Sequence, residues 1–211
     1  MFITFEGIEG CGKSTQARLL ADRLHGEGFR VTLTREPGGA PIADKIRAIL
    51  LDADNAAMTP LTELLLYAAA RSQHLHDRVR PALEAGELVI CDRFTDATMA
   101  YQGYGRGLDH HLIRQLNELA TGGLVPTLTI LMDCPVELGL GRALNRISGT
   151  LGAKEERFEQ ESLQFHRAVR SGYLTQASNE PERFAVVDAA GTIAQIAGKI
   201  SDIISAHLLG R

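Results

Sequence analysis

A glycine-rich octapeptide near the start of the chain constrains the fold more than any other feature. Residues 7–14, GIEGCGKS, match the pattern GxxxxGK(S/T), follow a short apolar run (Phe2–Phe5) and precede a helical pattern. Glycines let such a loop turn its backbone N–H groups inward around an anion, and the next helix points its N-terminus at the same place. The motif therefore predicts a strand, a phosphate-binding loop and a helix in succession, and with them a nucleoside triphosphate site.

Two side chains of this loop are expected to act on the phosphates. Lys13 would contact the β- and γ-phosphates, and the Ser14 hydroxyl would bind Mg²⁺. The chain has four lysines, and none has aspartate two residues later, so the guanine-reading motif (N/T)KxD is absent and a switch GTPase is excluded. Residues 188–191, DAAG, match a switch motif but follow the last predicted strand, where we expect a turn.

Short apolar runs alternate with longer amphipathic segments along the whole chain. The runs predict strands at Phe2–Phe5, Val31–Thr34, Leu88–Cys91, Thr127–Met132 and Phe184–Val187. The amphipathic segments predict helices at Ser14–His25, Ile42–Leu51, Leu61–Ala85, His110–Ala120, Val136–Arg146, Glu155–Gln176 and Ile193–Leu208. Such alternation predicts a three-layer α/β fold, with a parallel sheet between helices on both faces and ligands at the carboxyl ends of the strands.

Composition excludes several other classes of protein. The 211 residues fall within the range of one domain and contain no repeat or Pro/Ser-rich linker, so we expect residues 1–211 to form a single domain. A net charge of −4 disfavours a nucleic-acid-binding face. The longest stretch without charged residues, Leu119–Met132, is too short to span a bilayer, and the first residues resemble no export signal. Three cysteines without CxxC spacing favour a reducing cytoplasm.

Two predicted strands end in aspartate, and either carboxylate could hold Mg²⁺ near the triphosphate. These are Asp92 and Asp133, and periodicity does not choose between them. Asp92 is followed at once by Arg93, whose guanidinium could hold a second phosphate-bearing ligand. An ordinary ion pair at a strand end is the alternative interpretation.

Five segments in register resemble bacterial thymidylate kinases, in that family's order and over nearly the whole chain. They are residues 5–15 (FEGIEGCGKST), 34–39 (TREPGG), 92–94 (DRF), 100–103 (AYQG) and 157–161 (RFEQE). The resemblance implies a P-loop nucleoside monophosphate kinase with a five-stranded parallel sheet. It implies transfer of the γ-phosphoryl group of ATP to thymidine 5′-monophosphate with Mg²⁺, in a cytoplasmic homodimer without nucleic-acid or membrane partners.

The resemblance also implies which residues bind each ligand. Lys13, Arg93 and Arg146 would be catalytic, and Ser14 and Asp92 would hold Mg²⁺ directly or through water. The ATP site would comprise Gly7, Ile8, Glu9, Gly10, Cys11, Gly12, Lys13, Ser14, Thr15 and Arg142. The acceptor site would comprise Glu9, Glu36, Pro37, Tyr67, Arg71, Arg93, Thr98, Tyr101 and Gln102.

Particular roles follow by position within the acceptor set. Arg93 resembles the arginine that binds the acceptor's phosphate, and Tyr101 the residue that crowds the sugar's 2′ position. Tyr67 and Arg71 resemble the residues that stack on the base and donate to its carbonyl, and their i, i+4 spacing places them on one helix face. Since thymine O4 accepts where the cytosine amine donates, arginine would discriminate between the two bases. Without the resemblance, a core aromatic and a solvated charge would be the simpler interpretations.

A cationic segment interrupted by glycines, at about residues 142–161, is expected to form a lid over the phosphates. An exposed connection between helices is the alternative. Some members of the family carry a catalytic arginine in the phosphate loop, where this chain has Gly10 and Cys11, so we expect the lid to supply it. Arg146 is the first candidate, and Arg142 or Arg157 could share the role.

The chain departs from the family pattern in two places. Ala97 replaces a serine, so Thr98 is expected to take over a polar contact, and extra residues separate Arg146 from Arg157. Two other functions remain open from sequence. A deoxynucleoside kinase would use unphosphorylated thymidine, and a P-loop ATPase or switch would need no acceptor.

Overall fold

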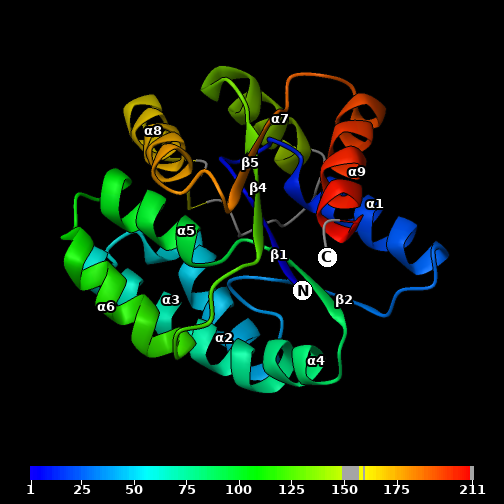
Figure 1. Cartoon of the computed structure of the whole chain (residues 1–211). Helices are drawn as coiled ribbons and strands as arrows, with labels where there is room; N and C mark the ends of the chain where they lie inside the picture. Colours follow the sequence, from blue (N-terminus) through cyan, green and yellow to red (C-terminus); the bar gives the residue numbers. More distant parts are fainter. Residues whose placement is uncertain (149–156, 159, 210–211) are drawn as a thin grey trace.

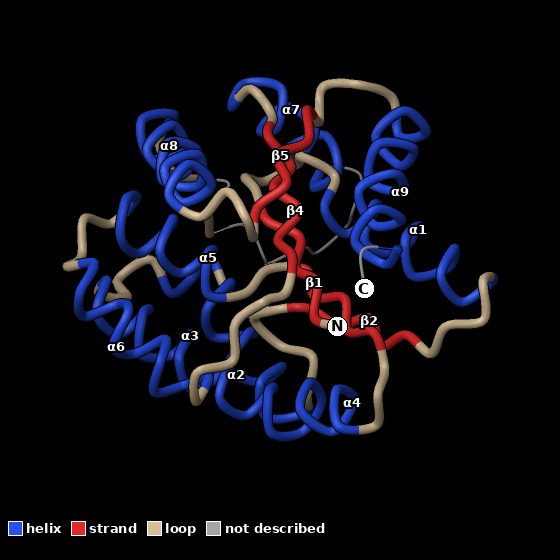
Figure 2. The backbone as a smooth tube through the Cα atoms, viewed as in Figure 1, coloured by secondary structure: helices blue, strands red, loops and turns tan. Residues whose placement is uncertain are grey.

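The computed structural model of the chain describes residues 1–148, 157–158 and 160–209, so residues 149–156 and 159 of the predicted lid at about 142–161 lie outside the described residues. Five parallel strands form one sheet in the order β2-β3-β1-β4-β5. They are β1 (Phe2–Glu6), β2 (Val31–Arg35), β3 (Leu88–Asp92), β4 (Leu128–Asp133) and β5 (Phe184–Asp188). The parallel α/β prediction is confirmed, and Figure 2 shows the strands through the centre with helices around them.

Helices cover both faces of this sheet. Figure 1 shows α1 and α9 together on one side and α5, α6 and α8 on the other. The α-helices are α1 (Lys13–Gly26), α2 (Pro41–Leu51), α3 (Pro60–His74), α4 (Arg80–Glu84), α5 (Thr95–Thr98), α6 (His110–Thr121), α7 (Val136–Ser148), α8 (Leu163–Asn179) and α9 (Ile193–Leu209). The described residues also form a 3₁₀ turn (Ala53–Asn55) and two π-helical segments (Leu75–Val79 and Met99–Gly105). No helix among the described residues has the length and apolar character to cross a membrane.

Every strand runs one residue further at its carboxyl end than the apolar pattern predicts. The added residues are Glu6, Arg35, Asp92, Asp133 and Asp188. Backbone pairing continues through these polar residues, because a ladder needs only N–H and C=O groups. The carboxyl edge of the sheet is therefore lined with charge. The central strand β1 is buried along its whole length, as expected for a strand covered on both faces.

Two helix predictions were wrong in extent. The helix expected at Leu61–Ala85 is divided by a π-helical turn into α3 and α4. The helix expected at Glu155–Gln176 begins only at Leu163, where the Ser162 hydroxyl accepts a hydrogen bond from the Phe165 N–H (3.2 Å) and caps it. The pattern also missed Thr95–Gly105, which forms α5 and a π-helical segment.

Candidate active site

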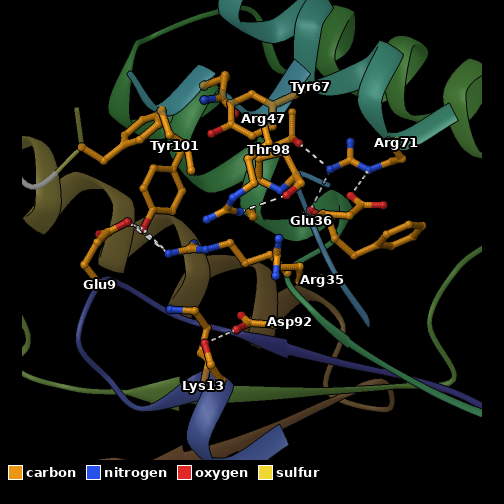
Figure 3. Close-up of a pocket in the computed structure, with 18 of the residues that line it drawn as sticks. Glu9, Lys13, Arg35, Glu36, Arg47, Tyr67, Arg71, Asp92, Thr98 and Tyr101 are labelled. Atoms are coloured by element: carbon orange, nitrogen blue, oxygen red, sulfur yellow. Dashed lines mark hydrogen bonds and ion pairs between the residues drawn. The ribbon is translucent and has the colours of Figure 1, made fainter. Parts of the chain in front are cut away.

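A cavity of about 220 Å³ opens at the carboxyl ends of β1, β2 and β3. It is lined by all nine residues of the predicted acceptor set, together with Gly10, Lys13, Ser14 and Asp92 of the predicted phosphate and metal sites. In Figure 3, Lys13 and Asp92 lie at one end of the cavity, Glu9 and Tyr101 on one wall, and Arg71 and Glu36 on the opposite wall. The remaining members of the predicted ATP set do not line it: Gly7, Ile8, Cys11, Gly12, Thr15 and Arg142.

The phosphate loop wraps around its own lysine. Lys13 Nζ donates to the carbonyl oxygens of Gly7 (2.9 Å) and Ile8 (2.7 Å). Gly10 has φ 67°, and a Cβ there would lie 1.9 Å from the carbonyl oxygen of Gly139 at the start of α7. The loop therefore needs glycine both for its backbone turn and for its close approach to a neighbouring helix.

The structure distinguishes the two strand-end aspartates. Asp92 Oδ2 accepts a hydrogen bond from the Ser14 hydroxyl at the first turn of α1. Asp133 instead accepts two hydrogen bonds from Arg170 of α8, at 2.7 and 2.8 Å. Asp92 is thus the carboxylate beside the phosphate loop, whereas Asp133 is occupied by an arginine.

Arg93 is held from three sides in an unusual backbone conformation. Its φ of 74° is in the left-handed region, which costs a non-glycine residue on the order of 1 kcal/mol. Nη2 donates to Glu9 (3.0 Å) and to the Tyr101 hydroxyl (3.1 Å), and Nη1 donates to the Tyr173 hydroxyl (3.1 Å). The guanidinium also lies 4.8 Å from the Tyr101 ring centroid. These contacts hold a cation at a fixed orientation on the cavity wall.

Two glutamates of opposite character flank this arginine. Burial opposes ionisation of Glu9, but His166, Arg93 and Lys13 favour its carboxylate and lower its pKa to about 2. Glu6 lies completely buried and accepts hydrogen bonds from the Phe94 N–H (2.7 Å) and the Tyr173 hydroxyl (2.9 Å). Burial, supported by the negative charge of Asp96, raises the pKa of Glu6 to about 8. At neutral pH, Glu9 is therefore ionised, whereas Glu6 is mostly protonated.

The opposite wall is organised around Arg71, which is only 2% exposed. Its guanidinium donates to Glu36 (2.8 Å), Asn117 (2.9 Å), the Phe94 carbonyl (3.0 Å) and the Thr98 hydroxyl (2.9 Å). These four bonds use four of its five N–H groups. Arg71 thus has a large structural role that its helical spacing from Tyr67 did not predict.

Three arginines of the predicted lid differ in what the structure shows. Arg157 is buried, donating to the Leu50 carbonyl (2.6 Å) and to Glu63 (2.5 Å), so its guanidinium is held beside α2 and α3. Arg142 donates to the Ala189 carbonyl (3.0 Å). The side chain of Arg146 lies outside the part of the chain that the structure describes.

Comparisons with known proteins identify the family of this chain. The sequence model of the thymidylate kinase family matches residues 5–200. The chain belongs to the thymidylate kinase family. It is 68% identical over 194 residues to the thymidylate kinase of Citrifermentans bemidjiense, covering 92% of this chain and 86% of that protein. It is 62% identical over 207 residues to that of Geotalea uraniireducens, covering 98% and 97%. A crystal structure of thymidylate kinase from Ehrlichia chaffeensis matches with a TM-score of 0.76 at 35% identity, over 97% of this chain and 98% of that one.

Several residues of this thymidylate kinase fold join the site without having been predicted. Arg35, Arg47, Leu51, Phe94 and Phe158 line the cavity, and Tyr173 contacts Arg93 from behind. Arg35 and Phe94 each adjoin a predicted site residue, so the edges of the predicted strands carried a signal for them. Tyr173 lies 80 residues from Arg93 in the sequence, and no local pattern connects the two.

Proposed function

We propose that this chain transfers the γ-phosphoryl group of ATP to thymidine 5′-monophosphate, giving ADP and thymidine 5′-diphosphate. One observation carries the proposal: the phosphate loop and an immobilised second cation, Arg93, line the same cavity. A phosphoryl transfer between two nucleotides needs a cationic group for each phosphate. A nucleoside kinase would have no acceptor phosphate for Arg93 to bind.

In this proposal the protein acts by positioning and by neutralising charge. Lys13 binds the β- and γ-phosphates of ATP, and Arg93 holds the acceptor's phosphate so that one of its oxygens attacks the γ-phosphorus. The new P–O bond forms as the bond to the β-phosphate oxygen breaks, and ADP leaves with that oxygen. Tyr101, which accepts a hydrogen bond from Arg93, would crowd the sugar's 2′ position.

Mg²⁺ fits the oxygen donors beside the loop. The Ser14 hydroxyl and the Asp92 carboxylate are hydrogen-bonded to each other, and both are hard ligands of the kind that Mg²⁺ prefers. These two residues would hold the ion directly or through water, and the bound ion would neutralise charge on the β- and γ-phosphates. With the ion bound, the Ser14 hydroxyl would contact the ion instead of donating to Asp92.

The base is proposed to lie between Tyr67 and Arg71. Both line the cavity, and the four hydrogen bonds of Arg71 leave one Nη1 hydrogen for thymine O4. The Thr98 hydroxyl accepts a hydrogen bond from Arg71, which supports the expectation that Thr98 takes over the polar contact of the serine that the family has at position 97. Glu36, Pro37 and Gln102 complete the acceptor pocket.

An acceptor panel tests the substrate assignment. ADP release is measured with thymidine, thymidine monophosphate, uridine monophosphate and cytidine monophosphate. We expect thymidine monophosphate to give the highest kcat/KM. A preference for thymidine would identify a nucleoside kinase instead, and hydrolysis of ATP that no acceptor stimulates would identify a P-loop ATPase.

We also propose that Arg146 stabilises the transferring phosphoryl group. Neither Gly10 nor Cys11 of the loop can supply a cation, and Arg157 is engaged with Glu63 and Leu50. An arginine in this role is worth on the order of 10³–10⁵ in rate. Arg146→Ala should therefore lower kcat strongly with little change in the acceptor's KM, and a kcat within threefold of the wild type would remove Arg146 from this role.

The family resemblance supports three broader proposals: that the chain is one domain, acts as a homodimer and works in the cytoplasm. All three cysteines are free and buried, as suits a reducing compartment. Light scattering at micromolar concentration tests the dimer, and a monomer mass would contradict it.

A further inference from the structure

A buried histidine behind the catalytic cavity has no role in the mechanism above. His166, in the first turn of α8, is completely buried. Its Nδ1 lies 3.3 Å from Oε2 of Glu9. Among the residues that the structure describes, neither of these two atoms has a hydrogen-bond partner, and neither does Nε2 of His166, so the close approach of Nδ1 to Oε2 is the nearest contact of this kind that the two atoms have. Buried polar atoms are nearly always satisfied in folded proteins, so two that face each other indicate a selected contact.

The two oxygens of Glu9 have different surroundings. Oε1 accepts hydrogen bonds from Arg93 (3.0 Å) and from the Tyr101 hydroxyl (2.5 Å), both on the cavity side. Oε2 has no hydrogen-bond partner among the described residues and lies 3.3 Å from Nδ1 of His166. Since the last torsion of a glutamate side chain is broad, one anchored oxygen does not fix the plane of the carboxylate. A donor at Oε2 supplies the missing constraint.

The frame around His166 is rigid enough for this purpose. Helix α8 packs against Met99–Gly105, the segment that carries Tyr101. A Cβ at Gly172 would lie 2.6 Å from the Tyr104 ring, and a Cβ at Gly105 would lie 2.6 Å from the Phe165 ring. Tyr173, which holds Arg93, is two turns along α8 from His166 and so on the same face. One helix therefore reaches both members of the Glu9–Arg93 pair.

We propose that His166 is a positioning residue, which donates its Nδ1–H to Oε2 of Glu9 and so keeps Oε1 on Arg93 and Tyr101. In the tautomer with its proton on Nδ1, Nε2 carries no hydrogen, which avoids burying an unpaired N–H. When the acceptor's phosphate arrives, a Glu9 anchored at both oxygens cannot rotate, and Arg93 keeps its orientation. This inference rests on the proposed function, because it assigns the acceptor's phosphate to Arg93.

Three substitutions separate the hydrogen bond from the packing of the ring. His166→Phe keeps an aromatic ring and removes the donor. His166→Asn places an amide near the position of Nδ1, whereas His166→Gln places one near Nε2, farther from Glu9. For each variant we would measure kcat, the KM values of thymidine monophosphate and ATP, thermal stability, and binding of thymidine monophosphate by calorimetry.

The expected results separate positioning from stability. Loss of a hydrogen bond to a buried charged group corresponds to about a tenfold effect. We expect His166→Phe to lower kcat/KM for thymidine monophosphate about tenfold and to weaken its binding similarly, with the KM of ATP within twofold. His166→Asn should recover to within about threefold of the wild type, and His166→Gln should not.

Two results would overturn the proposal: acceptor kinetics of His166→Phe within twofold of the wild type, or equal defects in the Asn and Gln variants. If His166→Phe does not fold, the contrast between Asn and Gln decides alone. The wild-type protein tests the proposed function separately. Absence of ADP release with thymidine monophosphate would reject that function, whereas a wild-type enzyme with unaffected variants would reject only the role of His166.

Discussion

Replacing Arg71 by methionine removes a guanidinium from the interior while keeping a long side chain in its place. Arg71 and Glu36 form a buried ion pair at 2.8 Å, with side chains 2% and 3% exposed. Among the described residues, the substitution leaves the Glu36 carboxylate with His74 as its side-chain partner, at 3.0 Å. It also removes the hydrogen bonds that Arg71 donates to Asn117, Thr98 and the Phe94 carbonyl.

The magnitude follows from burial and from the remaining partner. Removing one member of a buried ion pair costs about 3–5 kcal/mol, because it leaves an uncompensated charge. His74 still contacts Glu36, and methionine can pack against the Phe94 ring where the guanidinium now lies 5.3 Å from the centroid. We therefore expect the lower end, a loss of about 3 kcal/mol. For a chain of this length that corresponds to a Tm lower by about 6–12 °C.

Thermal unfolding followed by circular dichroism, without ligands, measures this loss. Arg71→Lys keeps the charge with fewer donors and should fall between the wild type and Arg71→Met. Arg114→Ala, at an exposed position of α6, is the matched control and should change the free energy of unfolding by less than about 0.5 kcal/mol. A Tm of Arg71→Met within about 2 °C of the wild type would refute the reasoning, because the guanidinium would then have no structural role.

Three further predictions concern the phosphate loop and its surroundings. A Cβ at Gly139 would lie 2.6 Å from the Glu9 carbonyl oxygen, so Gly139→Ala should displace the phosphate loop and raise the KM of ATP about tenfold or more. The control is Gly141→Ala on the same helix: a Cβ there meets open space, and the KM of ATP should not change. Burial holds the Glu6 pKa near 8, above its ordinary 4.5, so the folded protein binds that proton more tightly than the unfolded chain does and stability falls as pH rises from 5 to 8. Glu6→Gln should flatten this part of the profile in urea unfolding, and an unchanged slope would contradict the assignment. Asp92→Asn should raise the Mg²⁺ concentration needed for half-maximal activity, measured by ADP release, and an unchanged requirement would exclude Asp92 from the metal site.

The strands were predictable because each is a short apolar run bounded by turns. The apolar runs did not predict the last residue of each strand, because backbone pairing continues at a residue whose side chain is charged or acidic. The segment Thr95–Gly105 was missed for a related reason. It contains two glycines and lacks a clear apolar stripe, since it is buried between α6 and α8 rather than at a solvent boundary.

The composition of the acceptor pocket was predictable, but the internal bonding of its residues was not. Asp92 and Asp133 end strands that both neighbour β1, so local sequence treats them alike. The difference comes from α8, whose Arg170 occupies Asp133. Arg71 was predicted to face the base, yet most of its N–H groups turn toward Glu36, Thr98 and the backbone. Such pairings depend on helices that meet only after the chain has folded.

The contacts that α8 makes with Glu9 and Arg93 have a consequence for synthesis on the ribosome. The phosphate loop leaves the ribosome first, but Tyr173, which holds Arg93, emerges 80 residues after that arginine. A nascent or prematurely terminated chain that stops before α8 would hold the loop sequence without an organised acceptor site. Such a fragment could bind nucleotide unproductively, and the enzyme becomes competent only when its final third has been made.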